Sequence, residues 1–97
     1  MSWKVTFRAR LLQNNQVQVP KRIVEELQLW IGTRVDVGIS TRIRFIMFKT
    51  SIKKRFRFTI PHLELAGDPT KPGDIVEVYL TKLDVPSPEG STEPAAR

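Results

Sequence analysis

The chain contains no cysteine, so neither a disulfide nor a thiolate-bound metal can hold it together. It has no apolar run of the roughly 18 residues that a membrane-spanning helix needs, and its N-terminus lacks the apolar core of a signal peptide. It also lacks a phosphate-binding loop, a Ser-His-Asp spacing, or a second histidine to join His62 in a metal site. We therefore expect a cytoplasmic protein with no membrane contact, no cofactor and no metal, and not an enzyme.

Positive charge is abundant and unevenly placed. The 97 residues suit one small domain and carry 16 Lys and Arg against 10 Asp and Glu. Residues 1–57 hold 13 basic and 3 acidic residues, a net charge of +10, whereas residues 58–97 hold 3 and 7, a net charge of −4. A basic half indicates an acidic partner, and nucleic acid is the commonest one. A generally solubilising surface is the alternative.

The second half of the chain repeats the first at an offset of 41 residues. The segment "NQVQVPKRIVEELQLWIGTRVDVGI", residues 15–39, aligns without a gap with "FRFTIPHLELAGDPTKPGDIVEVYL", residues 56–80. Pro20 then falls on Pro61 and Gly32 falls on Gly73, and both residue types fix special backbone geometry. The offset indicates a duplicated unit, with one repeat over residues 4–40 and the other over 45–81.

Each repeat has the pattern strand, turn, strand, short helix, turn, strand. In the first repeat, Asn14 and Asn15 suit a tight turn between two alternating segments. A helix is predicted over residues 20–29, with Pro20 at its first position. In the second repeat, a glycine and two prolines in residues 67–72 leave room for at most two helical turns. The slot of the second helix is therefore predicted to hold a turn.

Residues 1–83 are predicted to form the single domain, and residues 84–97 a disordered tail, because the tail is rich in proline and nearly without apolar side chains. Phe48, Phe56 and Phe58 are in phase with the apolar faces of their strands and are predicted to be core. The alternative for these rings is stacking on unpaired bases. Phe45 is out of phase, which leaves its place open. Both tryptophans, Trp3 and Trp30, are predicted to be packing residues.

The first repeat resembles the AbrB/MazE/SpoVT family of swapped-hairpin proteins. The stretch "QVQVPKRIVEELQLWIGTRVDV" shows the family pattern of a strand ending in Val-Pro, a short helix, and a turn before a strand of type "xVxV". The second repeat keeps this frame in "FTIP" and "PGDIVEV". The resemblance implies a mainly β fold with one short helix, a swapped-hairpin barrel closed by two repeats of one chain with pseudo-twofold symmetry. The chain departs from the pattern at Gln28, where many relatives have a helix-ending glycine, and in the broken second helix.

Members of this family bind DNA mainly through basic residues on paired strands and hairpin loops. The resemblance therefore implies a transcription regulator or chromatin-associated factor that binds duplex DNA and is associated with the nucleoid. Every charged residue in residues 42–58 is basic, which predicts a ridge that contacts phosphates. The candidate contacts are Arg8, Arg10, Lys21, Arg22, Arg42, Arg44, Lys49, Lys53, Lys54, Arg55 and Arg57.

Two other functions stay open. The charge pattern does not distinguish DNA from RNA. Similar barrels also serve as protein-interaction modules, such as antitoxins or substrate-binding domains of ATPases, in which case the partner would be an acidic protein. The chain is expected to be a monomeric pseudodimer, or a homodimer formed through a sheet edge or Trp3.

Overall fold

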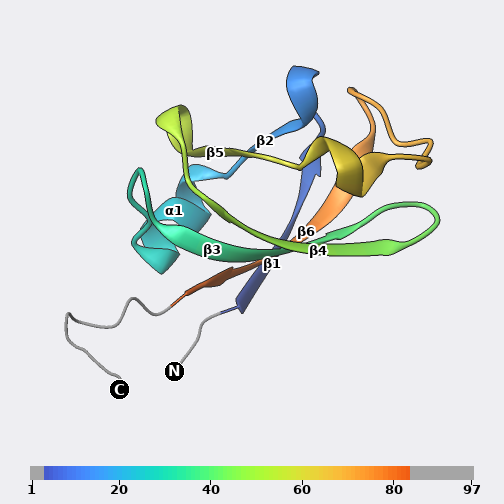
Figure 1. The fold of residues 1–97 in the computed structure, drawn as a ribbon. Helices are drawn as coiled ribbons and strands as arrows, with labels where there is room; N and C mark the ends of the chain where they lie inside the picture. Colours follow the sequence, from blue (N-terminus) through green and yellow to red (C-terminus); the bar gives the residue numbers. More distant parts are fainter. Residues whose placement is uncertain (1–3, 84–97) are drawn as a thin grey trace.

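The computed structural model describes residues 4–83 and confirms a mainly β fold with one short helix in this range (Figure 1). The predicted disordered tail, residues 84–97, and Trp3 lie outside the described residues. In chain order the elements are β1 (Lys4–Arg10), η1 (Gln13–Asn15), β2 (Gln16–Gln18), α1 (Lys21–Leu27), β3 (Arg34–Ser40), β4 (Phe45–Ser51), η2 (Lys54–Phe56), β5 (Arg57–Thr59), η3 (His62–Leu65) and β6 (Ile75–Lys82), where η marks a 3₁₀ helix.

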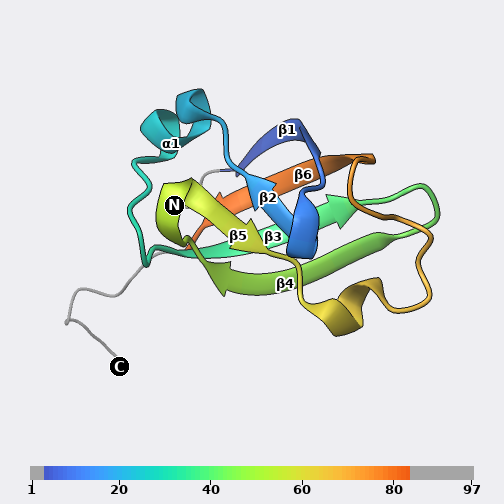
Figure 2. The ribbon, with the colours of Figure 1, turned by 90° about the horizontal axis from the view of Figure 1, so that it is seen from above.

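Two antiparallel sheets enclose the core. The larger has the strand order β1-β6-β3-β4, and β2 and β5 form a two-stranded ribbon. The ribbon lies over one face of the larger sheet, with α1 beside one end (Figures 1 and 2). Val37 and Val78 from the sheet and Val17 and Phe58 from the ribbon are almost completely buried. This layering follows from the alternation of apolar and polar residues along each strand, which gives the sheet one inner and one outer face.

The expectation of a closed barrel is wrong. β1 and β4 are the outer strands of the larger sheet and are not paired with each other. The turns η1 and η2 interrupt the path from β1 to β2 and from β4 to β5, and β2 and β5 have only three residues each. Because the ladders stop at these turns, the strands form two open sheets.

Each strand pair in residues 4–83 joins the first half of the chain to the second. The pairing follows the 41-residue offset. Lys4 pairs with Thr81, and the residues at the corresponding positions of the other half, Phe45 and Ser40, also pair with each other. Backbone hydrogen bonds do the same: the Leu11 N–H donates to the Asp74 carbonyl at 2.8 Å, and the Ile52 N–H donates to the Thr33 carbonyl at 2.9 Å. The described strands of either half form no sheet without the other half.

The two hairpin turns have the same backbone shape but different residues. Asn14 and Asn15 have φ angles of 61° and 58°, which confirms the prediction of a tight turn there. At the equivalent positions, Arg55 and Phe56 have φ angles of 61° and 55°. Asn tolerates this left-handed region, whereas Arg and Phe adopt it at a cost. Phe56 therefore belongs to the turn and is half-buried against the core, whereas the sequence predicted a core position within a strand.

The prediction that a turn takes the place of a second helix is confirmed, because η3 has only four residues. α1 buries Leu27, and Leu29 follows it into the core; their counterparts 41 residues later are Asp68 and Thr70. Pro20 precedes α1 as its N-cap, one position earlier than predicted, and Gln28 ends the helix with a φ of 56°, the conformation that favours glycine.

Two aromatic predictions need revision. Trp30 does not pack in the core: it lies in the loop after α1 with 73% of its surface exposed. Its backbone N–H donates to Thr33 Oγ1 at 2.8 Å within this loop. Phe48 is half-buried against the core, with its ring centroid 6.2 Å from that of Phe58, and Phe58 is fully buried as predicted.

Candidate nucleic-acid interface

Six of the predicted contact residues gather at one end of the ribbon. The Val19 N–H donates to the Phe56 carbonyl at 3.0 Å, so the end of β2 lies beside the turn η2. The start of α1 is therefore next to the second hairpin, and Lys21 and Phe56 line one shallow hollow. We call this group the ribbon-end cluster; it consists of Lys21, Arg22, Lys53, Lys54, Arg55 and Arg57.

Glutamine side chains of β2 fix part of this cluster. The Nε of Arg57 donates to Gln18 Oε1 at 2.9 Å, and its Nη1 donates to Gln16 Oε1 at 3.3 Å. Gln18 Nε2 donates in turn to the Arg55 carbonyl at 2.6 Å. Arg57 is half-buried and positioned, whereas the other five basic residues are exposed. Neutral amides hold Arg57 without cancelling its charge, and Glu25 is the acidic residue that lines the same hollow as Lys21.

The opposite end of the ribbon is neutral. There the Ile60 N–H donates to the Asn15 carbonyl at 2.9 Å, which is the counterpart of the bond between Val19 and Phe56. The turn η1 has the sequence Gln-Asn-Asn, and His62 and Leu63 follow Pro61 where Lys21 and Arg22 follow Pro20. The two ends of the ribbon therefore have the same backbone hydrogen bonding but different charge. Within residues 4–83, one end of the ribbon is therefore basic and the other is not.

Arg8, Arg10 and Lys49 lie elsewhere, on the outer face of the larger sheet. Their side chains alternate with those that point into the core, so they face away from the ribbon. Lys49 Nζ is 3.4 Å from Asp36 Oδ1 on the neighbouring strand, and Arg10 Nη1 donates to the Gly73 carbonyl at 2.9 Å. The sheet thus separates these three residues from the ribbon-end cluster.

Arg42 and Arg44 lie in the hairpin that joins β3 to β4, at the other end of β4 from η2. The predicted ridge over residues 42–58 is therefore divided between the two ends of one strand. Arg42 is exposed and lines a hollow of about 230 Å³ together with Arg8 and Glu77.

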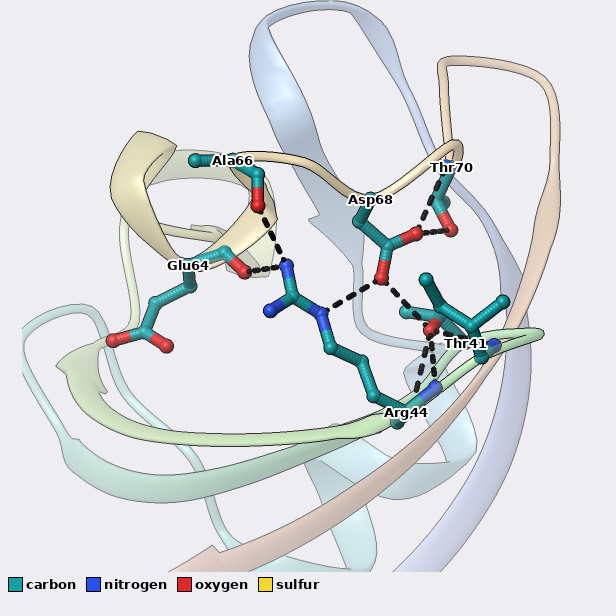
Figure 3. Close-up of polar contacts among 7 residues, drawn as sticks. Thr41, Arg44, Glu64, Ala66, Asp68 and Thr70 are labelled. Atoms are coloured by element: carbon teal, nitrogen blue, oxygen red, sulfur yellow. Dashed lines mark hydrogen bonds and ion pairs between the residues drawn. The ribbon is translucent and has the colours of Figure 1, made fainter.

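Arg44 has an internal role (Figure 3). Its Nε donates to Asp68 Oδ2 at 3.0 Å, and its Nη2 donates to the carbonyls of Glu64 and Ala66 at 2.8 and 3.0 Å. Thr41 Oγ1 donates to the same Asp68 oxygen at 2.9 Å. These bonds tie the β3–β4 hairpin to η3 and the segment that follows it, while 41% of the Arg44 side chain stays exposed.

Asp68 accepts further hydrogen bonds from the N–H and hydroxyl of Thr70, at 2.9 and 2.6 Å (Figure 3). The bonds from Thr70, with those from Arg44 and Thr41, outweigh burial and lower the pKa of the Asp68 carboxyl from 3.8 to about 2. The carboxylate is therefore charged throughout the neutral and mildly acidic range. Asp68 and Thr70 of this network stand at the positions that correspond to the buried Leu27 and Leu29 of the first half.

Sequence reasoning missed the composition of the outer sheet face. Lys4 belongs to the same outward set as Arg8, as the alternation of Lys4, Thr6, Arg8 and Arg10 could have indicated. Phe45 also points outward and is 51% exposed. Its ring meets that of Tyr79 edge-on, with centroids 5.5 Å apart. The pairing of β3 with both β4 and β6, which brings these rings together, could not be read from the alternation alone.

His62 is exposed in η3, and Asp68, which is near in sequence, is engaged with Arg44 and Thr70. Within residues 4–83, no three acidic or histidine side chains are grouped as ligands for a metal ion. No helix in the described part of the chain has the length and apolar character needed to cross a membrane.

Comparisons with known proteins extend the description of the fold. No protein-family model and no curated protein sequence matches the chain. The solution structure of PHS018 from Pyrococcus horikoshii superimposes with a TM-score of 0.72 at 16% sequence identity, and the match covers 82% of this chain and 94% of that chain. The two proteins therefore have a similar fold, and at this level of identity the likeness says nothing about what either one binds.

Proposed function

We propose that the chain is a tandem duplication of the AbrB/MazE/SpoVT swapped-hairpin unit. The element boundaries support this proposal, because β1, η1, β2 and β3 begin 41 residues before β4, η2, β5 and β6. The exchange of partners in the backbone hydrogen bonds supports it too: the Gly32 N–H donates to the Ile52 carbonyl, and the Gly73 N–H to the Leu11 carbonyl, each at 2.7 Å. In this interpretation the two halves play the parts of two family protomers around a pseudo-twofold axis.

On this basis we propose that the protein binds duplex DNA, as a transcription regulator or chromatin-associated factor. The observation that carries the proposal is the ribbon-end cluster, where two distant segments bring six basic residues, five of them exposed, to one end of the ribbon. Lys and Arg at such a site bind phosphates and release counterions, which gives affinity with a strong salt dependence. A two-stranded ribbon is also narrow enough to enter the major groove.

The ribbon-end cluster can act asymmetrically. A symmetric dimer would present two equal basic ends, whereas this chain has one basic and one neutral end. The proposed binding mode is therefore one ribbon end on one stretch of duplex, with Lys53, Lys54 and Arg55 on the phosphates. Arg57, held by Gln16 and Gln18, supports the turn from behind.

The test is a titration of labelled duplex DNA by fluorescence anisotropy between about 50 and 200 mM salt. Replacement of Lys53, Lys54 and Arg55 by Ala should weaken binding and reduce the slope of log K against log salt by about 2 to 3, since each phosphate contact contributes about 0.9. The same titration with duplex RNA separates the two nucleic acids.

A matched control removes the same charge from other surfaces. The variant Arg34→Ala, Lys71→Ala, Lys82→Ala has the same net charge as the cluster variant, but its changes lie outside the ribbon-end cluster. It should keep most of the salt slope. Equal slopes for the two variants would mean that only net charge matters, and an absence of duplex binding by the unaltered protein would reject the proposed function.

A further inference from the structure

The outer face of the larger sheet has an aromatic centre that duplex binding by the ribbon-end cluster does not use. Three side chains form it: Phe45 and Met47 on β4, which are 51% and 65% exposed, and Tyr79 on β6, which is half-buried. Outward-facing apolar side chains that lie singly need no explanation, but a contiguous group on a sheet marks a contact surface. We call these three residues the aromatic patch.

The aromatic patch is held in a defined geometry. The tip of the Phe45 ring occupies the space above Gly38 on β3, where any Cβ would overlap Cζ of Phe45. The hydroxyl of Tyr79 donates to Glu77 Oε1 at 3.0 Å, which orients the second ring. A hollow of about 320 Å³ lies beside the two rings, and Lys4, Asp36 and Met47 are also among its lining residues. Rigid rings beside an open hollow can accept a flat group without much loss of side-chain entropy.

The surroundings of the aromatic patch are cationic. Lys4 Nζ lies over the Tyr79 ring, 5.5 Å from its centroid. Lys49 is two residues after Met47 on β4 and faces outward like Met47. The outward positions of the four strands hold five basic residues and two acidic ones, a net charge of +3. The basic residues are Lys4, Arg8, Arg10, Arg34 and Lys49, and the acidic ones are Asp36 and Glu77.

These charges indicate which kind of partner the aromatic patch can bind. A second copy of this chain docking through the same face would set +3 against +3, and the apolar area is small for a stable dimer. A polyanion that also carries flat apolar groups complements both the charges and the rings. We propose that the aromatic patch binds single-stranded nucleic acid, with an unpaired base stacked on the Phe45 ring in the hollow beside it and the flanking phosphates near Lys4, Lys49 and Arg8. This inference rests on the proposed nucleic-acid function but assigns a second surface to it.

The two surfaces lie on opposite sides of the larger sheet, because the ribbon covers the inner face and the aromatic patch lies on the outer face. Duplex binding and single-strand binding should therefore be separable by mutation. Stacking of a base on an aromatic ring contributes about 1–3 kcal/mol, so loss of the ring should be measurable as a change of about tenfold or more in affinity.

The experiment compares labelled oligothymidylate with an abasic strand of the same length and phosphate charge. The unaltered protein should bind oligothymidylate about tenfold more tightly than the abasic strand. Phe45→Leu keeps the apolar cover of Gly38 but removes the π-face, and it should lose this preference. Phe45→Trp should retain it, and both variants should bind duplex DNA as the unaltered protein does.

Two further variants make the result decisive. Met47→Ala removes an exposed wall of the hollow without uncovering Gly38, and it should weaken oligothymidylate binding severalfold even if Phe45→Leu proves unstable. Trp30→Leu removes an exposed aromatic ring outside the aromatic patch and should change nothing.

Equal affinity of the unaltered protein for thymidylate and abasic strands would overturn the proposal. So would a concentration-dependent dimer, seen by analytical ultracentrifugation, that Phe45→Leu abolishes, since the aromatic patch would then serve self-association. If duplex DNA does not bind, the proposed function itself fails. Duplex binding without a preference for bases rejects only the second surface.

Discussion

Arg55 and its counterpart Asn14 have the same backbone conformation but different suitability for it. Both have a φ of 61°, a region that costs most residues about 1–2 kcal/mol and that Asn enters more readily. The strained residue is the one in the ribbon-end cluster. A cationic side chain at the tip of a hairpin is well placed to reach a phosphate, which would explain why a residue unsuited to the turn occupies it.

We therefore predict opposite effects of one change on stability and on binding. Arg55→Asn should raise the free energy of unfolding by about 0.5–1 kcal/mol, because Asn accepts the left-handed conformation. It should also weaken duplex binding severalfold. Urea denaturation and anisotropy titration measure the two effects. Asn14→Arg is the mirror control and should destabilise by a similar amount; a gain in stability there would contradict the argument.

Gly38 and Phe45 form a second pair at the residue scale. Glycine within a strand is usually unfavourable, but here it makes room for the tip of an aromatic ring. Gly38→Ala should destabilise the protein by about 1–3 kcal/mol, because the ring or the strand must move. In a Phe45→Ala background the same change should cost nothing or stabilise. A double-mutant cycle from urea denaturation checks this coupling, and additive effects would show that the two residues are independent.

At the scale of elements, the two halves solve one packing problem in two ways. The first half covers the core with α1, Leu27 and the following Leu29, whereas the second uses η3 and the hydrogen bonds around Asp68 (Figure 3). Apolar burial is insensitive to pH, but the stability that Asp68 contributes depends on its charge. Only the second half should therefore respond to acid through this part of the fold.

The pKa of Asp68 is lowered in the folded state from 3.8 to about 2. Its contribution to stability is therefore fully present above about pH 4 and is lost as the pH falls towards 2. We expect the difference in Tm between the unaltered protein and Asp68→Asn to shrink over this interval, as measured by circular dichroism. A difference that stays constant down to pH 2 would exclude Asp68 as the titrating group. Glu64→Gln is a control, since Glu64 contributes its backbone carbonyl to the Arg44 network.

At the scale of the whole molecule, the halves depend on each other. The described strands of each half pair only with strands of the other half. We predict that a peptide of residues 1–42 is unfolded as a monomer, because no ladder can form within it, and that addition of residues 43–97 restores the β-sheet spectrum in circular dichroism. A peptide of residues 1–42 that folds as a monomer would contradict the pairing described here.

Much of the fold could be predicted from sequence, because strands and turns depend on local pattern. The alternation around Val35 and Val37, the pair Asn14-Asn15, and the prolines that break the second helix each specify their element nearby. The open sheets could not be predicted, because closure depends on how many residues of β2 and β5 remain extended after the turns. The exposure of Trp30 depends on the direction of a loop, which no periodicity describes.

The candidate site was predictable only in part. Clustering of basic residues in the sequence identified η2 correctly as a basic turn, but it could not show that Lys21 lies beside it, since that contact depends on the register of β2 and β5. In the sequence, Arg44 is one basic residue among several in residues 42–58, and only its contact with Asp68 distinguishes its role. Three-dimensional pairing therefore decides which arginines remain free for a partner.

The pairing of β1 with β6 also has a consequence for synthesis of the protein. Lys4 is paired with Thr81, so 77 further residues must be translated before that partner exists. At about 5–20 residues per second the first strand waits for several seconds on the ribosome without its neighbour. During that time its Phe7 and the apolar residues of β3 are exposed to other chains. The high density of positive charge in the first half, which repels a second nascent chain of the same kind, would keep these segments apart until the last strand arrives.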